Sequence, residues 1–303
     1  MRPVFPWKLR TRALELGKRT LIMGIVNVTP DSFSDGGKFL DRDKAVEHAE
    51  TMLAEGADII DIGGESTRPG SHVAGGASSE SKGSHAPSLD AEQELQRVLP
   101  VIEELKKRHP VVVISVDTYK AAVARAAVEA GAEIVNDVSG LCWDPEMAAT
   151  VAKLKCGVVL MHMRGRPDEW RTLPPADDVV RLVQQELKER AEQALAAGVR
   201  RESIVLDPGF GFGKNFEQNY PLIAHFAKFH AAGFPLLAGT SRKSFLGRTL
   251  RSDGKDAPPQ ERLFGTIATE TALILQGAHV VRTHDVKASA QAAKVADAIL
   301  QAN

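Results

Sequence analysis

The sequence contains only two cysteines, Cys142 and Cys156, and no CxxC spacing. A disulfide framework is therefore excluded, and a reducing, cytoplasmic location is favoured. No apolar run approaches the roughly 18 residues that a membrane-spanning helix needs, and no apolar core follows the basic N-terminus as in a signal peptide. Lys plus Arg number 38 and Asp plus Glu 39. This balance argues against nucleic acid or an anionic membrane as a partner.

Eight short, mostly apolar runs alternate with stretches of helical periodicity along the 303 residues. Runs of this kind are typical of parallel strands buried on both faces. The predicted strands are 20–27, 58–62, 111–117, 133–138, 157–163, 203–207, 235–240 and 279–283. Apolar residues recur on one helical face in 43–55 and in 179–195 between them. The alternation predicts an α/β protein, a (β/α)8 TIM barrel with a single domain, and a doubly wound open sheet is the alternative. We expect an N-terminal extension at 1–19 and the barrel at 20–303.

Polar or ionisable side chains stand at the end of nearly every predicted strand. These residues are Asn27, Asp61, Asp117, Asn136, His162, Asp207, the group Ser241-Arg242-Lys243, Arg282 and His284. Helix capping would explain any one of them, for example Asp117 before Thr118. The side chain of His162 could equally be hydrogen-bonded by a neighbouring loop and have no role in binding. The strand ends of a barrel meet at one face, so polar residues at eight ends favour a ligand site there.

The residue types indicate the chemistry of the ligand. Asp117, Asn136 and Asp207 accept and donate hydrogen bonds in pairs, which suits a flat heterocycle with an amidine or guanidine edge. Asn27 offers an uncharged oxygen to a hard cation. The cationic donors, which suit a phosphate or diphosphate, are Arg68, Lys243, Arg282 and His284. The glycine-rich segment 207–214 fits neither the Walker A nor the GxGxxG pattern, so we expect a tight turn there.

Several motifs together resemble the dihydropteroate synthase family. They are MGIVNVTPDSFSDGG (23–37), DIGGESTRPG (61–70), SVDT (115–118), NDVSG (136–140), DPGFGFGK (207–214), GTSRKSFLG (239–247) and VRTHDV (281–286). The resemblance runs from about residue 20 to 300 in the order of the family. It implies a TIM barrel that condenses (7,8-dihydropterin-6-yl)methyl diphosphate with 4-aminobenzoate in folate biosynthesis, releasing diphosphate. It also implies Mg²⁺ as cofactor, a pterin-binding site and a homodimer.

The resemblance further implies roles for individual residues. The residues matching the pterin pocket are Asp117, Asn136, Asp207 and Lys243. Asn27 matches the Mg²⁺–diphosphate site, and Arg282 and His284 match an anion clamp. Asp35 and Arg68 match a lid over the substrates. The residues matching positions around the aminobenzoate are Phe33, Thr67, Pro69, Phe212 and Ser244. We expect Asp117, Asp207, Lys243, Asp35 and Arg68 to be catalytic.

The chain departs from the family pattern at 71–87, a Ser-, Gly- and His-rich insertion. Its composition is that of a flexible loop. We expect it to modulate access or to be disordered, without altering the chemistry.

Three other functions share some of these features. A pterin-binding methyltransferase domain would have the barrel and the pterin aspartates, but would act on methyltetrahydrofolate. A Schiff-base aldolase would use Lys243 as its nucleophile. A non-catalytic paralogue would only bind pterins. The STRPG and SRKS segments favour the synthase over the methyltransferase.

Overall fold

The computed structural model describes residues 2–28, 38–65, 89–170 and 172–302. Some sequence predictions lie outside the described residues. They are those for Phe33, Asp35, Thr67, Arg68, Pro69 and the insertion 71–87.

Eight parallel strands form the central sheet, in the order β8-β7-β6-β5-β4-β3-β10-β9. The strands are β3 (Leu21–Asn27), β4 (Ile59–Gly63), β5 (Val113–Asp117), β6 (Ile134–Asp137), β7 (Gly157–Met161), β8 (Ile204–Asp207), β9 (Leu237–Ala238) and β10 (Val280–Thr283). The two end strands meet through a parallel bridge between Leu206 and Leu236. The amide of Leu206 also donates to the Pro235 carbonyl at 2.9 Å. The sheet therefore closes into a barrel, which confirms the predicted fold over the open-sheet alternative.

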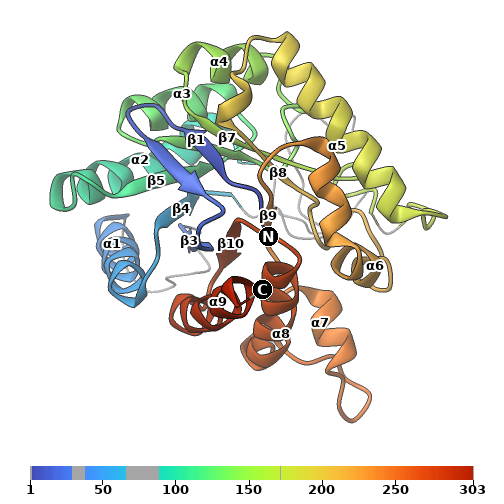
Figure 1. Cartoon of the computed structure of the whole chain (residues 1–303). Coiled ribbons are helices and arrows are strands. Elements are labelled where there is room, and N and C mark those ends of the chain that lie inside the picture. Colours follow the sequence, from blue (N-terminus) through green and yellow to red (C-terminus); the bar gives the residue numbers. More distant parts are fainter. Residues whose placement is uncertain (1, 29–37, 66–88, 171, 303) are drawn as a thin grey trace, which may run out of the picture.

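Helices surround the barrel on its outside (Figure 1). They are α1 (Lys38–Glu55), α2 (Ala91–Arg108), α3 (Ala121–Glu129), α4 (Met147–Leu154), α5 (Val179–Ala196), α6 (Asn219–Ala224), α7 (Ser244–Thr249), α8 (Leu263–Leu275) and α9 (Val286–Gln301), with the 3-10 segments η2 (Arg201–Ser203), η3 (Phe226–Ala232) and η4 (Pro259–Glu261). Local sequence signals mark where some of these helices begin. Asp90 and Gln93 form a capping box at the beginning of α2. Among the described residues, no helix is both long and apolar enough to cross a bilayer.

Successive residues of each barrel strand face opposite sides, as the pleat of a strand requires. Ile60 and Ile114 belong to the core between the barrel and its helices. Their neighbours Ile59 and Val113 belong to a second core inside the barrel. Both faces of the sheet are therefore buried, which explains why the strands read as continuous apolar runs.

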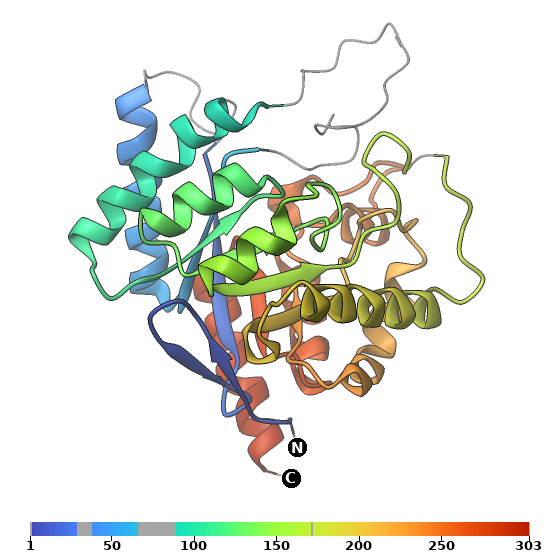
Figure 2. The same ribbon diagram turned by 90° about the horizontal axis from the view of Figure 1, so that it is seen from above.

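An antiparallel hairpin of β1 (Phe5–Lys8) and β2 (Ala13–Leu16) precedes the barrel. Trp7 and Leu16 are fully buried in the interior core together with the first residues of the barrel strands. The indole nitrogen of Trp7 donates to the Ser203 carbonyl at 2.9 Å. The hairpin thus closes the N-terminal end of the barrel, and Figure 2 shows it at the same end as both termini. The strands finish at the opposite end, and the polar residues that follow or end them lie there.

Candidate active site

The strand pleat decides which polar residues enter the barrel. Ile59, Ile134, Val205 and Val280 all belong to the interior core. The residues two positions further along these strands therefore also face inward. They are Asp61, Asn136, Asp207 and Arg282. The interior of the barrel is consequently apolar near its N-terminal end and polar near its C-terminal end, where Asp117 completes β5.

Arg282 joins three polar residues from other strands in what we call the Arg282 cluster: Asp61, Asp117, Asn136 and Arg282. Its Nε donates to Asp61 Oδ2 at 2.6 Å, and its Nη2 donates to Asp117 Oδ2 at 2.7 Å. Asn136 Nδ2 donates to the same Asp61 oxygen at 3.1 Å. Lys120, not Asp117, occupies the N-cap of α3. The capping interpretation of Asp117 is therefore wrong, and its carboxylate faces a guanidinium instead.

Burial raises the pKa of Asp117 to about 7, with Arg282 acting against this shift and Asp61 adding to it. Burial alone would lower the pKa of Arg282, but Asp61 and Asp117 outweigh it, so this pKa lies above its ordinary value. The guanidinium therefore stays charged, while Asp117 ionises within the physiological pH range. Two carboxylates around one cation make this end of the barrel receptive to positive charge or to N–H donors.

Asp207 ends β8 and starts the predicted glycine-rich turn. Its Oδ1 accepts from the Gly209 amide at 2.7 Å. Burial raises the pKa of Asp207 to about 6, while this hydrogen bond, Lys243 and Lys214 act in the opposite direction. Gly209 and Gly211 have positive φ values of 67° and 81°, which confirms the tight turn.

Lys214 is a buried lysine that none of the sequence predictions named. Its Nζ donates to the carbonyls of His162, Gly209 and Phe212 at 3.1, 2.7 and 3.1 Å. Burial lowers the pKa of Lys214 well below its ordinary value, and Asp207 opposes the shift. Three acceptors match the three N–H bonds of the ammonium form, so we infer that this lysine is protonated. The local sequence signal for this role is the position of Lys214, directly after the glycine-rich segment whose carbonyls it contacts.

Apolar groups form the wall beside the polar cluster. Met161 and Met163 belong to a small core at this end, and Phe212 packs against it. Lys243 Nζ lies 3.8 Å from the Phe212 ring centroid, a cation–π contact. Ser244 is the exposed first residue of α7. The predicted pterin residues therefore stand beside a surface that suits the face of a flat ring.

His284 differs from the sequence prediction in its charge. Burial lowers the pKa of His284 to about 3, and the nearby Arg282 and Arg242 lower it further. Its Nδ1 lies 3.0 Å from the Ser241 hydroxyl. The imidazole is thus neutral at pH 7 and offers a hydrogen bond instead of the expected positive charge. The sequence prediction of a cation did not take into account that His284 is buried beside two arginines, because a sequence does not show burial or contacts between distant residues.

His162 faces away from the barrel interior. It follows Met161, which lies in the core at the site, and its Nε2 contacts Glu186 of α5 at 2.9 Å. Burial lowers the pKa of His162 well below its ordinary value. Its polar partner comes from a helix on the outside of the barrel, so this side chain is not part of the Arg282 cluster.

Asn27 is the sequence-predicted ligand of a metal ion. It ends β3, is partly exposed and pairs in register with Gly63, which has no side chain to crowd it. Among the described residues, no group of three or more His, Cys, Asp or Glu side chains is placed to hold a metal ion. Mg²⁺ often takes one or two protein oxygens and completes its shell with water and substrate phosphates. A single asparagine oxygen fits that mode of binding. It does not by itself make a metal site built from protein ligands alone.

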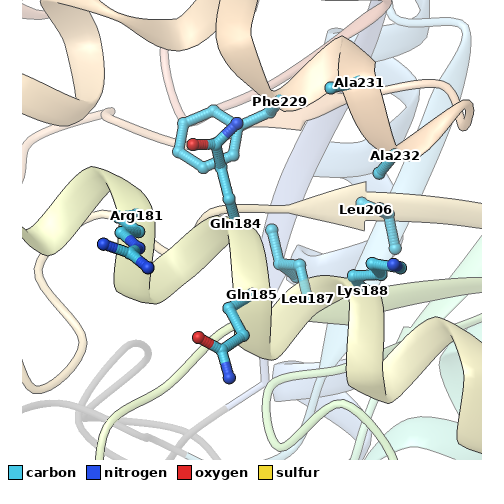
Figure 3. Close-up of a pocket in the computed structure, with 9 residues that line it drawn as sticks. All are labelled: Arg181, Gln184, Gln185, Leu187, Lys188, Leu206, Phe229, Ala231 and Ala232. Atoms are coloured by element: carbon cyan, nitrogen blue, oxygen red, sulfur yellow. The ribbon is translucent and has the colours of Figure 1, made fainter.

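A cavity of about 330 Å³ lies between α5, β8 and η3 (Figure 3). Leu206, one of its lining residues, is on the outward face of β8, because Val205 belongs to the interior core. None of the sequence-predicted site residues lines it. This cavity is therefore on the helical side of the barrel wall, separate from the Arg282 cluster.

Comparison with known proteins shows similarity in both sequence and fold. Residues 23–284 match the family described as pterin binding enzyme. The dihydropteroate synthase of Synechocystis is 45% identical over 284 residues, 93% of this chain and 91% of the relative. A crystal structure of dihydropteroate synthase from Clostridium difficile in the presence of pteroic acid is 44% identical, covers 94% of this chain and 98% of that chain, and superposes with a TM-score of 0.82. The Xanthomonas albilineans enzyme with 4-aminobenzoic acid is 41% identical, covers 98% and 99% of the two chains, and has a TM-score of 0.85. From its motifs, its closed barrel and these relatives, we conclude that the chain belongs to the pterin-binding enzymes as a member of the dihydropteroate synthase family.

Proposed function

We propose that the C-terminal end of this barrel condenses (7,8-dihydropterin-6-yl)methyl diphosphate with 4-aminobenzoate. The bond between the methylene carbon and the diphosphate oxygen breaks, and a bond to the aminobenzoate nitrogen forms. The products are 7,8-dihydropteroate, diphosphate and the proton lost by the amine. The observation that carries the proposal is the Arg282 cluster, where carboxylates, a carboxamide and a guanidinium converge inside the barrel.

The pterin ring would lie between the polar residues and the apolar wall. Asp117, Asn136 and Asp207 come from three different strands and offer paired donors and acceptors to the edge of the ring. Met161 and Phe212 supply a surface for its face. An ionised carboxylate next to an electron-rich ring also stabilises positive charge that develops on it.

This electrostatic role supports an SN1-like path. Departure of diphosphate leaves a cation that the dihydropterin ring delocalises, and the aminobenzoate nitrogen then attacks the methylene carbon. Asp117 and Asp207 would stabilise the cation, while Lys243 and Arg282 would orient the substrate and its anionic group. His284 would donate a hydrogen bond to that anion, with its Nδ1 directed at the Ser241 hydroxyl. The path needs no covalent bond to the enzyme.

Asn27 would contribute the protein oxygen of a Mg²⁺ site shared with the substrate. The ion would supply charge neutralisation to the departing diphosphate. The remaining roles rest on the motif resemblance. They are those of Asp35 and Arg68 in a lid, and of Phe33, Thr67, Pro69, Phe212 and Ser244 around the aminobenzoate.

We further propose a cytoplasmic homodimer whose catalytic domain spans residues 20–303. Phe264 on α8 is 84% exposed and Val295 on α9 is 63% exposed. These two helices pack side by side, so the apolar residues lie on neighbouring elements. A second copy of the chain is the partner that we propose for this surface.

The test is an assay of diphosphate release with the pterin substrate and Mg²⁺, with and without 4-aminobenzoate. We expect turnover to require both substrates. Asp117→Asn and Lys243→Ala should each lower kcat by at least ~10²-fold, the scale on which a group aimed at developing charge contributes. Near-normal rates in both variants would remove these residues from the mechanism. Borohydride should trap no adduct, whereas a labelled Lys243 would favour the Schiff-base aldolase.

A further inference from the structure

Asp61 is the most deeply buried member of the Arg282 cluster, with 0% of its surface exposed. It lies on β4 between Ile60 and Ile62, which both pack outward against the helices. Its carboxylate therefore points into the barrel. A charge in such a place costs free energy unless partners compensate it.

The partners of Asp61 come from strands that are not its neighbours in the sheet. Its Oδ2 accepts from Arg282 Nε at 2.6 Å and from Asn136 Nδ2 at 3.1 Å. β10 and β6 are each separated from β4 by one intervening strand. One carboxylate oxygen thus fixes two side chains that approach from opposite sides.

The other carboxylate oxygen, Oδ1, is buried and has no hydrogen-bond partner among the described residues. An unpaired buried oxygen lowers stability, and well-packed apolar side chains often replace buried ion pairs without loss. Stability of the fold therefore does not account for a carboxylate here. The hydrogen bonds that it accepts from Arg282 and Asn136 explain why a carboxylate stands at this position.

We propose that Asp61 is a positioning residue that sets the orientation of the Arg282 guanidinium and the Asn136 carboxamide for the pterin diphosphate. Asp117 fixes Arg282 at Nη2 only, so without Asp61 the guanidinium is free to turn about that single contact. Asp61 acts through these two side chains and does not itself touch the substrate. The inference rests on the proposed function, because Arg282 and Asn136 matter only if they bind that substrate.

The experiment is steady-state kinetics of Asp61→Ala and Asp61→Asn with the pterin diphosphate, 4-aminobenzoate and Mg²⁺. Asp61→Ala should raise KM for the pterin diphosphate at least ~10-fold, because small displacements of binding groups have large effects. KM for 4-aminobenzoate should change less than about 2-fold, since the hydrogen bonds of Asp61 are to Arg282 and Asn136, which are proposed to bind the pterin substrate. Asp61→Asn keeps an acceptor oxygen and should recover part of the loss.

Asp297→Asn is the matched control. Asp297 is also a buried aspartate paired with an arginine, Arg2 at 2.9 Å, but it binds Thr20 at the closed end of the barrel. It should lower the melting temperature without changing either KM. Unchanged KM values in both Asp61 variants, or an equal rise for both substrates, would overturn the proposal.

Calorimetric binding of pteroic acid separates this inference from the proposed function. A wild-type chain that binds pteroic acid but releases no diphosphate would refute the proposed reaction. The positioning role would still require at least ~10-fold weaker binding of pteroic acid by Asp61→Ala than by the Asp297→Asn control. Equal affinities of the two variants would refute it independently of turnover.

Discussion

Asp207 shows how burial sets the chemistry of a single residue. Its pKa is raised to about 6, so it loses its charge as pH falls through this value. We predict that kcat/KM for the pterin diphosphate decreases between about pH 8 and pH 5, because Asp117, with a pKa of about 7, and Asp207 both lose the negative charge that stabilises the cation. A pH profile of kcat/KM measures this, and a ³¹P titration of the free substrate separates its own ionisation. An acid limb with its midpoint below about pH 4 would contradict the prediction.

Gly209 is a residue for which a single methyl group decides the local structure. Its φ is +67°, and a Cβ there would lie 1.9 Å from the His162 carbonyl oxygen. We predict that Gly209→Ala displaces the loop that carries Phe212 and Lys214, and raises KM for the pterin diphosphate. Gly254 has a similar φ of +75°, but a Cβ added there would meet nothing within 4 Å, so Gly254→Ala is the matched control. It should cost about 1 kcal/mol of stability from backbone strain and leave both KM values unchanged. Equal kinetics of the two variants would disprove the steric argument.

At the scale of an element, the N-terminal hairpin completes the interior core of the barrel. Trp7 is fully buried there beside Leu16 and the first residues of the strands. We predict that Trp7→Ala lowers the free energy of unfolding by about 3–5 kcal/mol, as for other large core truncations. Urea denaturation measures this loss. KM for both substrates should stay unchanged under folding conditions, because the Arg282 cluster lies at the other end. A variant of normal stability would show that the hairpin is not part of the core.

At the scale of the whole molecule, α8 and α9 together present apolar side chains to the exterior. Phe264→Glu places a charge on this surface, and we predict that it converts a dimer into monomers. Sedimentation velocity distinguishes the two states. Val111 is 78% exposed beside β5, so Val111→Glu is a control that should remain dimeric. Dimers of both variants would place the subunit contact elsewhere.

Local signals in the sequence are sufficient for the barrel and for much of the site. The eight apolar runs predict the eight strands because a parallel strand buried on both faces must be apolar along its length. Asp117, Asn136 and Asp207 stand at the ends of those runs, so their meeting at one face follows from the closure of the barrel. The hairpin is less visible, since β1 and β2 are short and alternate in burial without a continuous apolar run.

The amino-acid order thus determined the strand–helix alternation, the family and the set of polar residues at the strand ends. The tertiary structure decided how those residues are paired and charged. Arg282 contacts partners 221 and 165 residues away in the chain, which no local pattern encodes. The neutral ring of His284 and the outward direction of His162 likewise depend on burial and on the side of the strand that each residue faces. Desolvation and neighbouring charges act through space, so the chemistry of these groups exists only once the barrel has closed.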